Sequence, residues 1–294
     1  MMDSYENKLA LRVSGLNKKN KTNDFSLKNI NIEVPYGSIV GNIGRNGAGK
    51  STTISCVLGM FQKDEGKVEI FGTEYCNQID IKKHIGVVLD DPNYSLLLTP
   101  NEINEVMKFN YSNWEEDSFK NYLNRFNLPI DKKTKQFSFG MKKKLSLAIA
   151  LSHETKLLIL DEITSGLDPV SRDEILCILL EFIENPEHSV YISSHITTDL
   201  EKIADYIVFM DNGKVVLSEE KDELLYNYGI LRCTDTELEK VEKTDIISYR
   251  KEFGRVDILV KDISKIKNKY KEFVVNKPNF DEMLLILTLT WKED

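Results

Sequence analysis

The chain has 294 residues, a length that fits one large domain or two ordinary ones. Hydrophobic residues make up 41% of it and charged residues 29%, as is typical of a globular protein with a sizeable core. The formal net charge of −8 argues against nucleic acid as the main partner, because proteins that bind nucleic acid usually carry a basic surface.

No segment of the sequence has the character of a membrane anchor. Residues 1–9 mix polar and charged side chains and lack the basic and then apolar regions of a secretory signal. The richest apolar run, 283–289, is far shorter than the roughly 20 residues that a membrane span requires. We therefore expect any membrane role to come through a partner chain.

The first predicted elements are strands that lead into a glycine-rich loop. Strand-like segments at 9–13 and 30–34 flank a polar run at 17–24, which is predicted to be a loop. A short apolar strand is predicted at 38–43, and a helix from 50 to about 60 follows the glycine-rich loop.

The middle of the chain reads as a helical insertion followed by alternating strands and helices. Within 92–135, Phe119, Tyr122, Leu123 and Phe126 recur at helical spacing. The next predicted elements are a helix at 142–151, strands at 157–160 and 189–193, a helix at 197–204 and a strand at 206–210. This alternation predicts an α/β domain with a mostly parallel sheet.

The pattern changes after Gly213. A charged helix is predicted at 219–228, and a strand at 255–260 alternates apolar and polar residues. Asn279 and Glu282 form a capping-box pattern ahead of a last helix. We interpret residues 220–294 as a small α/β appendix.

The strongest chemical motif is a phosphate-binding loop of the form GxxxxGK[ST] between a predicted strand and a predicted helix. Glycines let the backbone wrap closely around a phosphate chain, and successive N–H groups form an anion nest at the helix N-terminus. Lys50 is expected to reach the β- and γ-phosphates, and the Ser51 hydroxyl to ligate Mg²⁺. The alternative is a chance glycine-rich turn. The residues assigned to ATP here are Gly44, Arg45, Asn46, Gly47, Ala48, Gly49, Lys50, Ser51 and Thr52.

A second motif is an apolar strand that ends in two carboxylates. Asp161 can hold Mg²⁺ through water, and Glu162 is placed to polarise the attacking water as a general base. The alternative is a pair of surface acids after a strand.

Three further motifs complete an ordered set. Ser138 and Gly140 lie in the sequence SFGM, which begins 23 residues before Asp161 (161 − 138) and precedes a helix. Asp168 lies in the sequence SGLDP after the carboxylates, and His195 ends the sequence SSH after the next strand. A lone histidine is more often structural. In this order, however, the motifs resemble the signature, D-loop and switch histidine of ABC ATPases.

The resemblance covers about residues 9–220. It implies a P-loop fold with a RecA-like core, a helical subdomain at about 91–155 and an antiparallel β portion, together spanning residues 1–219. It also implies that two copies, or this chain and a homologous ATPase, sandwich two ATP molecules head to tail. Ser138, Gly140 and Asp168 would then face ATP across the dimer. A membrane-spanning transporter subunit would hold the dimer at the cytoplasmic face of the membrane.

The chain departs from the family pattern at several positions. Asp90 stands where the family has a glutamine that contacts Mg²⁺ or its water. Ile163 stands where the family usually has a proline after the two carboxylates. The aromatic residue that stacks on adenine is not obvious; Phe25 is the candidate, and core packing is its alternative. The signature itself carries Phe137, Phe139 and Met141 in place of the usual residues.

These departures are similar to one branch, the bacterial ABC-2-type exporter ATPases. That branch includes ATPases for antimicrobial-peptide immunity and for export of amphipathic peptides such as phenol-soluble modulins. The cargo itself is not readable from this sequence, because it would contact the membrane subunit.

Two other function classes are a soluble ABC ATPase without a transporter partner and a catalytically dead subunit. A soluble ABC ATPase of the chromosome type would have a long coiled coil, but only 88 residues separate Lys50 from Ser138 (138 − 50). A translation factor of this family would carry two nucleotide-binding domains in one chain, whereas this sequence contains one set of the motifs. A catalytically dead subunit is disfavoured because Lys50, Glu162 and His195 are all present.

Overall fold

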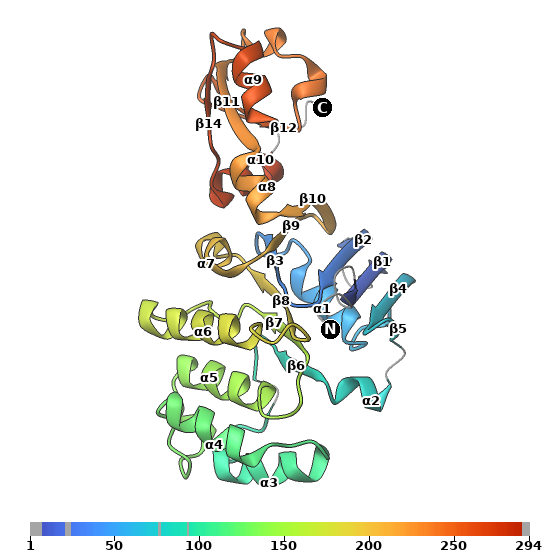
Figure 1. The fold of residues 1–294 in the computed structure, drawn as a ribbon, viewed down its shortest axis with the longest axis vertical. Coiled ribbons are helices and arrows are strands. Elements are labelled where there is room, and N and C mark those ends of the chain that lie inside the picture. Colours follow the sequence, from blue (N-terminus) through green and yellow to red (C-terminus); the bar gives the residue numbers. More distant parts are fainter. Residues whose placement is uncertain (1–7, 21–24, 76–77, 93, 290–294) are drawn as a thin grey trace.

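The computed structural model describes residues 8–20, 25–75, 78–92 and 94–289. Figure 1 shows an elongated molecule with the helices α3, α4 and α5 at one end and the last helices and strands of the chain at the other. Between them lies a six-stranded sheet, with an antiparallel sheet beside it. No helix in these ranges is long and apolar enough to span a bilayer.

The six-stranded sheet has the order β10-β9-β3-β8-β7-β6, and all neighbours are parallel except β9 and β10. Parallel strands bring their carboxyl ends to one edge, so the segments that follow β3, β6, β7 and β8 meet there. The strands are β3 (Ile39–Gly44), β6 (Ile85–Val88), β7 (Leu157–Asp161), β8 (Ser189–Ser194), β9 (Tyr206–Asp211) and β10 (Lys214–Glu220).

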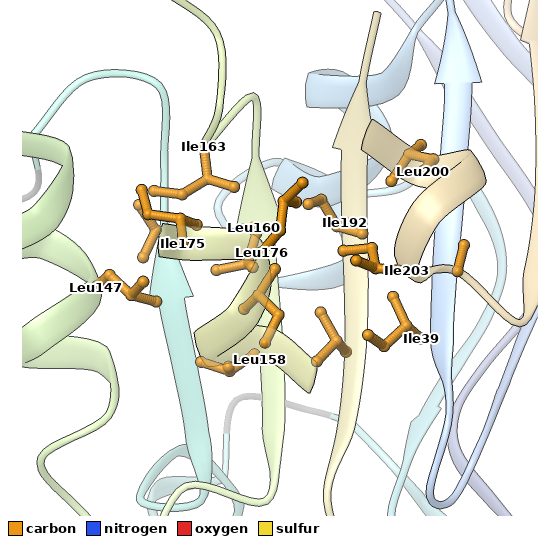
Figure 2. Packing of buried hydrophobic residues seen from close by; sticks show 14 of the residues in the cluster. Ile39, Leu147, Leu158, Leu160, Ile163, Ile175, Leu176, Ile192, Leu200 and Ile203 are labelled. Carbon is orange, nitrogen blue, oxygen red and sulfur yellow. The ribbon is translucent and has the colours of Figure 1, made fainter. Parts of the chain in front are cut away.

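The two faces of this sheet belong to two different apolar clusters. On β7, Leu158 and Leu160 pack into one cluster, whereas Leu157 and Ile159 pack into the other. Alternate side chains of a strand point to opposite faces, which explains the division. The first cluster includes residues of α5 (Phe139–Ala150), α6 (Pro169–Phe182) and α7 (Thr197–Ile203), and Figure 2 shows part of it. The second cluster includes residues of α1 (Lys50–Val57) and of the antiparallel sheet.

The antiparallel sheet has the order β2-β1-β4-β5. Its strands are β1 (Leu9–Lys19), β2 (Ser26–Pro35), β4 (Glu65–Ile70) and β5 (Thr73–Glu74). The prediction that the whole polar run 17–24 is a loop was wrong at its start, because residues 17–19 continue β1, while 21–24 lie outside the described residues. Backbone pairing of β1 with β2 across register shifts continues the strand past its apolar residues.

The predicted helical insertion is confirmed. Residues 92–135 contain α3 (Pro100–Asn110), α4 (Glu116–Arg125) and a 3₁₀ turn (Thr134–Gln136), and α5 follows them. The short helix α2 (Ile79–Lys82) precedes β6 and lies outside the insertion. Phe119 and Leu123 are buried on α4, as the spacing predicted. The helix predicted at 142–151 begins earlier, at Phe139, because Ser138 caps it by accepting a hydrogen bond from the Met141 N–H at 3.2 Å.

One long helix, α6, was not predicted. Its signals are present in the sequence: Asp168 accepts hydrogen bonds from the backbone N–H groups of Val170 and Ser171, and Pro169 occupies the first turn. Ile175 and Leu179 are buried at helical spacing.

The appendix forms a third sheet, of order β12-β13-β11-β14. Its elements are α8 (Lys221–Tyr226), β11 (Tyr228–Thr234), 3₁₀ turns at Leu238–Lys240 and Lys243–Asp245, β12 (Ser248–Glu252), β13 (Arg255–Lys261), α9 (Ile263–Lys269), β14 (Val274–Asn276) and α10 (Phe280–Thr288). The helix predicted at 219–228 is shorter in the structure, because 219 and 220 pair with β9 and Tyr228 opens β11. The capping box is confirmed, with Asn279 and Glu282 each accepting a hydrogen bond from the other's backbone N–H.

The last helix joins the appendix to the sheet. Phe280 and Met283 of α10 are buried in the same apolar cluster as Ile39 and Leu200. The Phe280 ring stands edge-on to the Phe209 ring of β9, with ring centroids 6.0 Å apart. The core is therefore continuous from the six-stranded sheet into the appendix.

Candidate active site

The glycine-rich loop connects the end of β3 to the start of α1. Gly47 and Gly49 have φ values of 84° and 111°, a left-handed region that favours glycine. A Cβ on Gly49 would come within 2.7 Å of Leu27 and 3.0 Å of Phe25, so the close approach also requires glycine. Gly44 and Ala48 are buried, Thr52 is half-buried, and the residues whose surface faces outward are Arg45, Asn46, Gly47 and Ser51.

Lys50 is buried beneath this loop. Its ammonium donates to the carbonyl oxygen of Gly44 at 2.7 Å and lies 3.1 Å from Oε1 of Glu162. A cation held under a turn of outward-facing residues is the arrangement that a phosphate chain needs, and the structure thus brings two predicted site residues into contact.

Glu162 stands between Lys50 and His195. Its Oε2 lies 2.6 Å from Nδ1 of His195 and also accepts from the His195 backbone N–H at 3.3 Å. The Glu162 side chain is 12% exposed, and its Oε1 has the ammonium of Lys50 as its ionic neighbour. The carboxylate is therefore fixed at both oxygens, by Lys50 of α1 and by His195, which directly follows β8. This suits a group that must hold one position during proton transfer.

Asp161 is buried at the end of β7, where its Oδ1 accepts a hydrogen bond from the Ser193 hydroxyl. In the described ranges no group of three or more His, Cys, Asp and Glu side chains could hold a metal ion. Magnesium at nucleotide sites typically takes only one or two protein ligands and completes its shell with phosphate and water oxygens. Asp161 and Ser51 fit that requirement. Ser193 is a supporting residue to which sequence analysis gave no role of its own.

The signature residues lie on the other face of the sheet from α1. Ser138 caps α5, whose side chains pack into the first apolar cluster, whereas α1 packs into the second. Within one chain the signature contacts the D-loop instead: a Cβ on Gly140 would lie 3.3 Å from Leu167, and one on Gly166 would lie 3.0 Å from Phe139.

Asp168 is occupied as the N-cap of α6. Hydrogen bonds, above all from the backbone of Ser171, lower the pKa of its carboxyl. The cap fixes the direction in which the D-loop enters α6. A contact of Asp168 with nucleotide stays a prediction.

Asp90 follows β6, and its carboxylate pairs with the ammonium of Lys143 at 2.9 Å. Lys143 also donates to the backbone carbonyl of Glu162 at 3.1 Å. Lys143 matches no motif that predicts a role for it. The Mg²⁺ role assigned to Asp90 stays a prediction, and the structure gives its carboxylate another partner.

Phe25 is half-buried against the second apolar cluster, with its ring beside Gly49 at the end of the loop. This position agrees with its packing alternative and leaves the stacking on adenine as a prediction.

A buried lysine under a glycine-rich turn, with a fixed carboxylate opposite, defines the class of P-loop nucleotide hydrolases. Comparison with known proteins narrows the class. Residues 27–165 match the ABC transporter family. The lantibiotic transport ATP-binding protein SrtF of Streptococcus pyogenes is 37% identical over 212 residues, which are 70% of this chain and 91% of the relative. The bacitracin transport ATP-binding protein BcrA of Bacillus licheniformis is 34% identical over 194 residues, 65% of this chain and 63% of the relative.

The fold comparison agrees. A solved structure described as an ATP binding subunit of an ABC transporter has a TM-score of 0.67 and 27% identity, covering 74% of this chain and 92% of that one. The chain belongs to the ABC transporter family of ATP-binding proteins, and it is an ATPase of that family. The predicted fold class and family are confirmed.

Proposed function

We propose that this chain powers the export of amphipathic peptides through a separate membrane-spanning subunit, at the cytoplasmic face of the membrane. The observation that carries the ATPase part is the contact of Glu162 with both Lys50 and His195. The export part is supported by the signature FSFGMKKKL and by relatives whose names describe lantibiotic and bacitracin transport.

In the proposed reaction Lys50 leaves Glu162 for the β- and γ-phosphates when ATP binds. Glu162 then accepts a proton from the attacking water, and His195 positions both the Glu162 carboxylate and the γ-phosphate. Mg²⁺, held by Ser51 and Asp161, would neutralise charge on the phosphate oxygens.

The export proposal is tested by searching the neighbouring genes for a membrane-spanning subunit and co-expressing that subunit with this chain. The two chains are expected to purify together, and a lantibiotic or bacitracin is expected to stimulate ATP hydrolysis by the complex in lipid vesicles. An ATPase that purifies without a membrane protein and ignores such peptides would support a soluble role and end the export proposal.

Lys50→Ala removes the charge aimed at the phosphates. Hydrogen bonds to charged groups are worth about 1.5–3 kcal/mol, so ATP should bind about 10- to 100-fold more weakly. Titration with a fluorescent ATP analogue measures this. Lys144→Ala is the control, because Lys144 lies on α5 and its ammonium is paired with Glu174 of α6 at 2.7 Å. Equal affinities of wild type and Lys50→Ala would contradict the assignment.

We further propose a head-to-tail dimer in which Ser138 and Gly140 contact ATP held by the other copy. This dimer is supported by the positions of α5 and α1, which pack on opposite faces of the six-stranded sheet. The helix N-terminus at Ser138 attracts a phosphate, but the loop of the same chain lies across the sheet.

Mixing two inactive variants tests this dimer. Ser138→Asp still caps α5, but it repels a phosphate. A dimer of one Ser138→Asp chain and one Lys50→Ala chain keeps one composite site intact, so ATP hydrolysis is expected to recover in part. Differently tagged chains prove that mixed dimers form. Mixed dimers without any recovery would place the signature in cis.

A further inference from the structure

Lys143 is a buried cation between three motifs. Its side chain is only 3% exposed, and its ammonium lies 2.9 Å from Oδ1 of Asp90 and 3.1 Å from the carbonyl oxygen of Glu162. The ring of Phe139 lies 5.4 Å away, from centroid to ammonium. A buried charge is costly unless it is paired and hydrogen-bonded, so each of these partners compensates for the burial of Lys143.

The backbone that Lys143 contacts is in an unusual conformation. Glu162 has a φ of 51°, which non-glycine residues adopt only where surrounding contacts hold them. Its N–H donates to the carbonyl of Ser193 at 3.1 Å, and its own carbonyl accepts from the Ser165 N–H at 3.2 Å as well as from Lys143. These hydrogen bonds fix the peptide planes on both sides of Glu162, and so fix the direction of its side chain.

We propose that Lys143 is a positioning residue for the general base, and that Asp90 holds Lys143 in place for this task. The inference rests on the proposed role of Glu162. The chain of contacts runs from the segment after β6, through the signature helix α5, to the backbone of Glu162 at the end of β7. A displacement of Asp90 or of α5 would withdraw a charged donor from the Glu162 carbonyl and release the strained peptide.

The proposal also accounts for the acid at position 90. An amide there carries no charge and cannot neutralise a lysine, whereas a carboxylate supplies the anion that Lys143 needs. Asp90 and Lys143 form a matched pair, and the Asp90 side chain, at 65% exposure, lies close enough to the surface to move.

The experiment compares ATPase kinetics of Lys143→Gln, Lys143→Arg, Asp90→Asn and the double variant Lys143→Gln/Asp90→Asn. Lys144→Gln is the matched control: Lys144 lies on the same helix, is 14% exposed, pairs with Glu174 at 2.7 Å and stacks on Phe126 at 5.8 Å, with no contact to Glu162 in the described structure. ATP affinity and the midpoint of urea unfolding are measured for each variant.

For Lys143→Gln we expect kcat to fall about 10- to 100-fold, the range for loss of a charged hydrogen bond, with ATP affinity within about twofold of wild type. Lys143→Arg should regain part of kcat. Asp90→Asn should lower kcat by itself and add little in the double variant, because both changes break one chain of contacts. Asp90→Asn keeps the test decisive if Lys143→Gln does not fold.

Three results would overturn the proposal: equal kcat losses in Lys143→Gln and Lys144→Gln, a loss that follows the unfolding midpoint in all variants, or additive effects of Lys143 and Asp90. Failure of the underlying ATPase assignment is distinguishable, because wild type would then lack hydrolysis or Glu162→Gln would retain it.

Discussion

Replacing Glu162 by glutamine is expected to lower ATP hydrolysis about 10²–10⁴-fold, the usual loss on removal of a positioned acid–base group. Glutamine keeps the size of the side chain and can still meet His195 Nδ1, which lies 2.6 Å from Oε2. It cannot accept the proton of the attacking water. It also removes the negative charge that lies 3.1 Å from Lys50 in the wild type, so Lys50 is released for the phosphates.

Because binding is retained and hydrolysis is blocked, Glu162→Gln should accumulate with ATP as a closed dimer. Light scattering after gel filtration in Mg-ATP measures the dimer, and phosphate release measures hydrolysis. Glu174→Gln is the control, since Glu174 is a paired carboxylate on α6 that contacts Lys144. Continued hydrolysis by Glu162→Gln, without a gain of dimer, would mean that another group is the base.

Phe280→Ala is expected to destabilise the whole chain by about 3–5 kcal/mol, the usual cost of removing a large buried aromatic side chain. Phe280 is fully buried, and its ring stands edge-on to Phe209 in the sheet that carries the site. Its backbone N–H donates to Glu201 on α7 at 2.9 Å, and the neighbouring Asp281 accepts from the hydroxyl of Thr197 at 2.6 Å. The mutation leaves these polar contacts and removes only packing.

Urea unfolding of the full chain measures the change. The control is Phe253→Ala, because Phe253 is fully exposed at the turn between β12 and β13 and surface changes usually stay within about 0.5 kcal/mol. We propose that residues 1–219 and 220–294 form two units with separate sheets and one shared hydrophobic core. Two separate unfolding transitions in the wild type, or less than about 1 kcal/mol lost in Phe280→Ala, would contradict the shared core.

α7 begins two residues after His195, so the contacts of α10 with α7 support the segment that carries the histidine. The sequence predicts the capping box and the apolar face of α10 but not the surface that this face covers. An amphipathic pattern states that a face is buried; it does not name the partner.

Local signals determined much of this protein. The glycine-rich loop was predictable because its conformation depends on glycine at particular positions, such as Gly49 with its φ of 111°. The buried strand β7 was predictable from its continuous apolar run, and the start of α10 from its capping box. The family followed from the order of the motifs, and so did the expectation that Lys50, Glu162 and His195 act together.

Contacts between distant segments were decided only by the tertiary structure. Lys143 reads as one of three lysines on a helix, yet it alone of the three is almost fully buried, because α5 turns that side chain toward Asp90 and Glu162. The apolar face predicted for the last helix did not show that Phe280 packs against Phe209 of the six-stranded sheet. In both cases the deciding quantity is burial against residues on other elements, such as Asp90, which is 53 positions from Lys143. Such contacts depend on how the sheet brings its strands together and not on any local pattern.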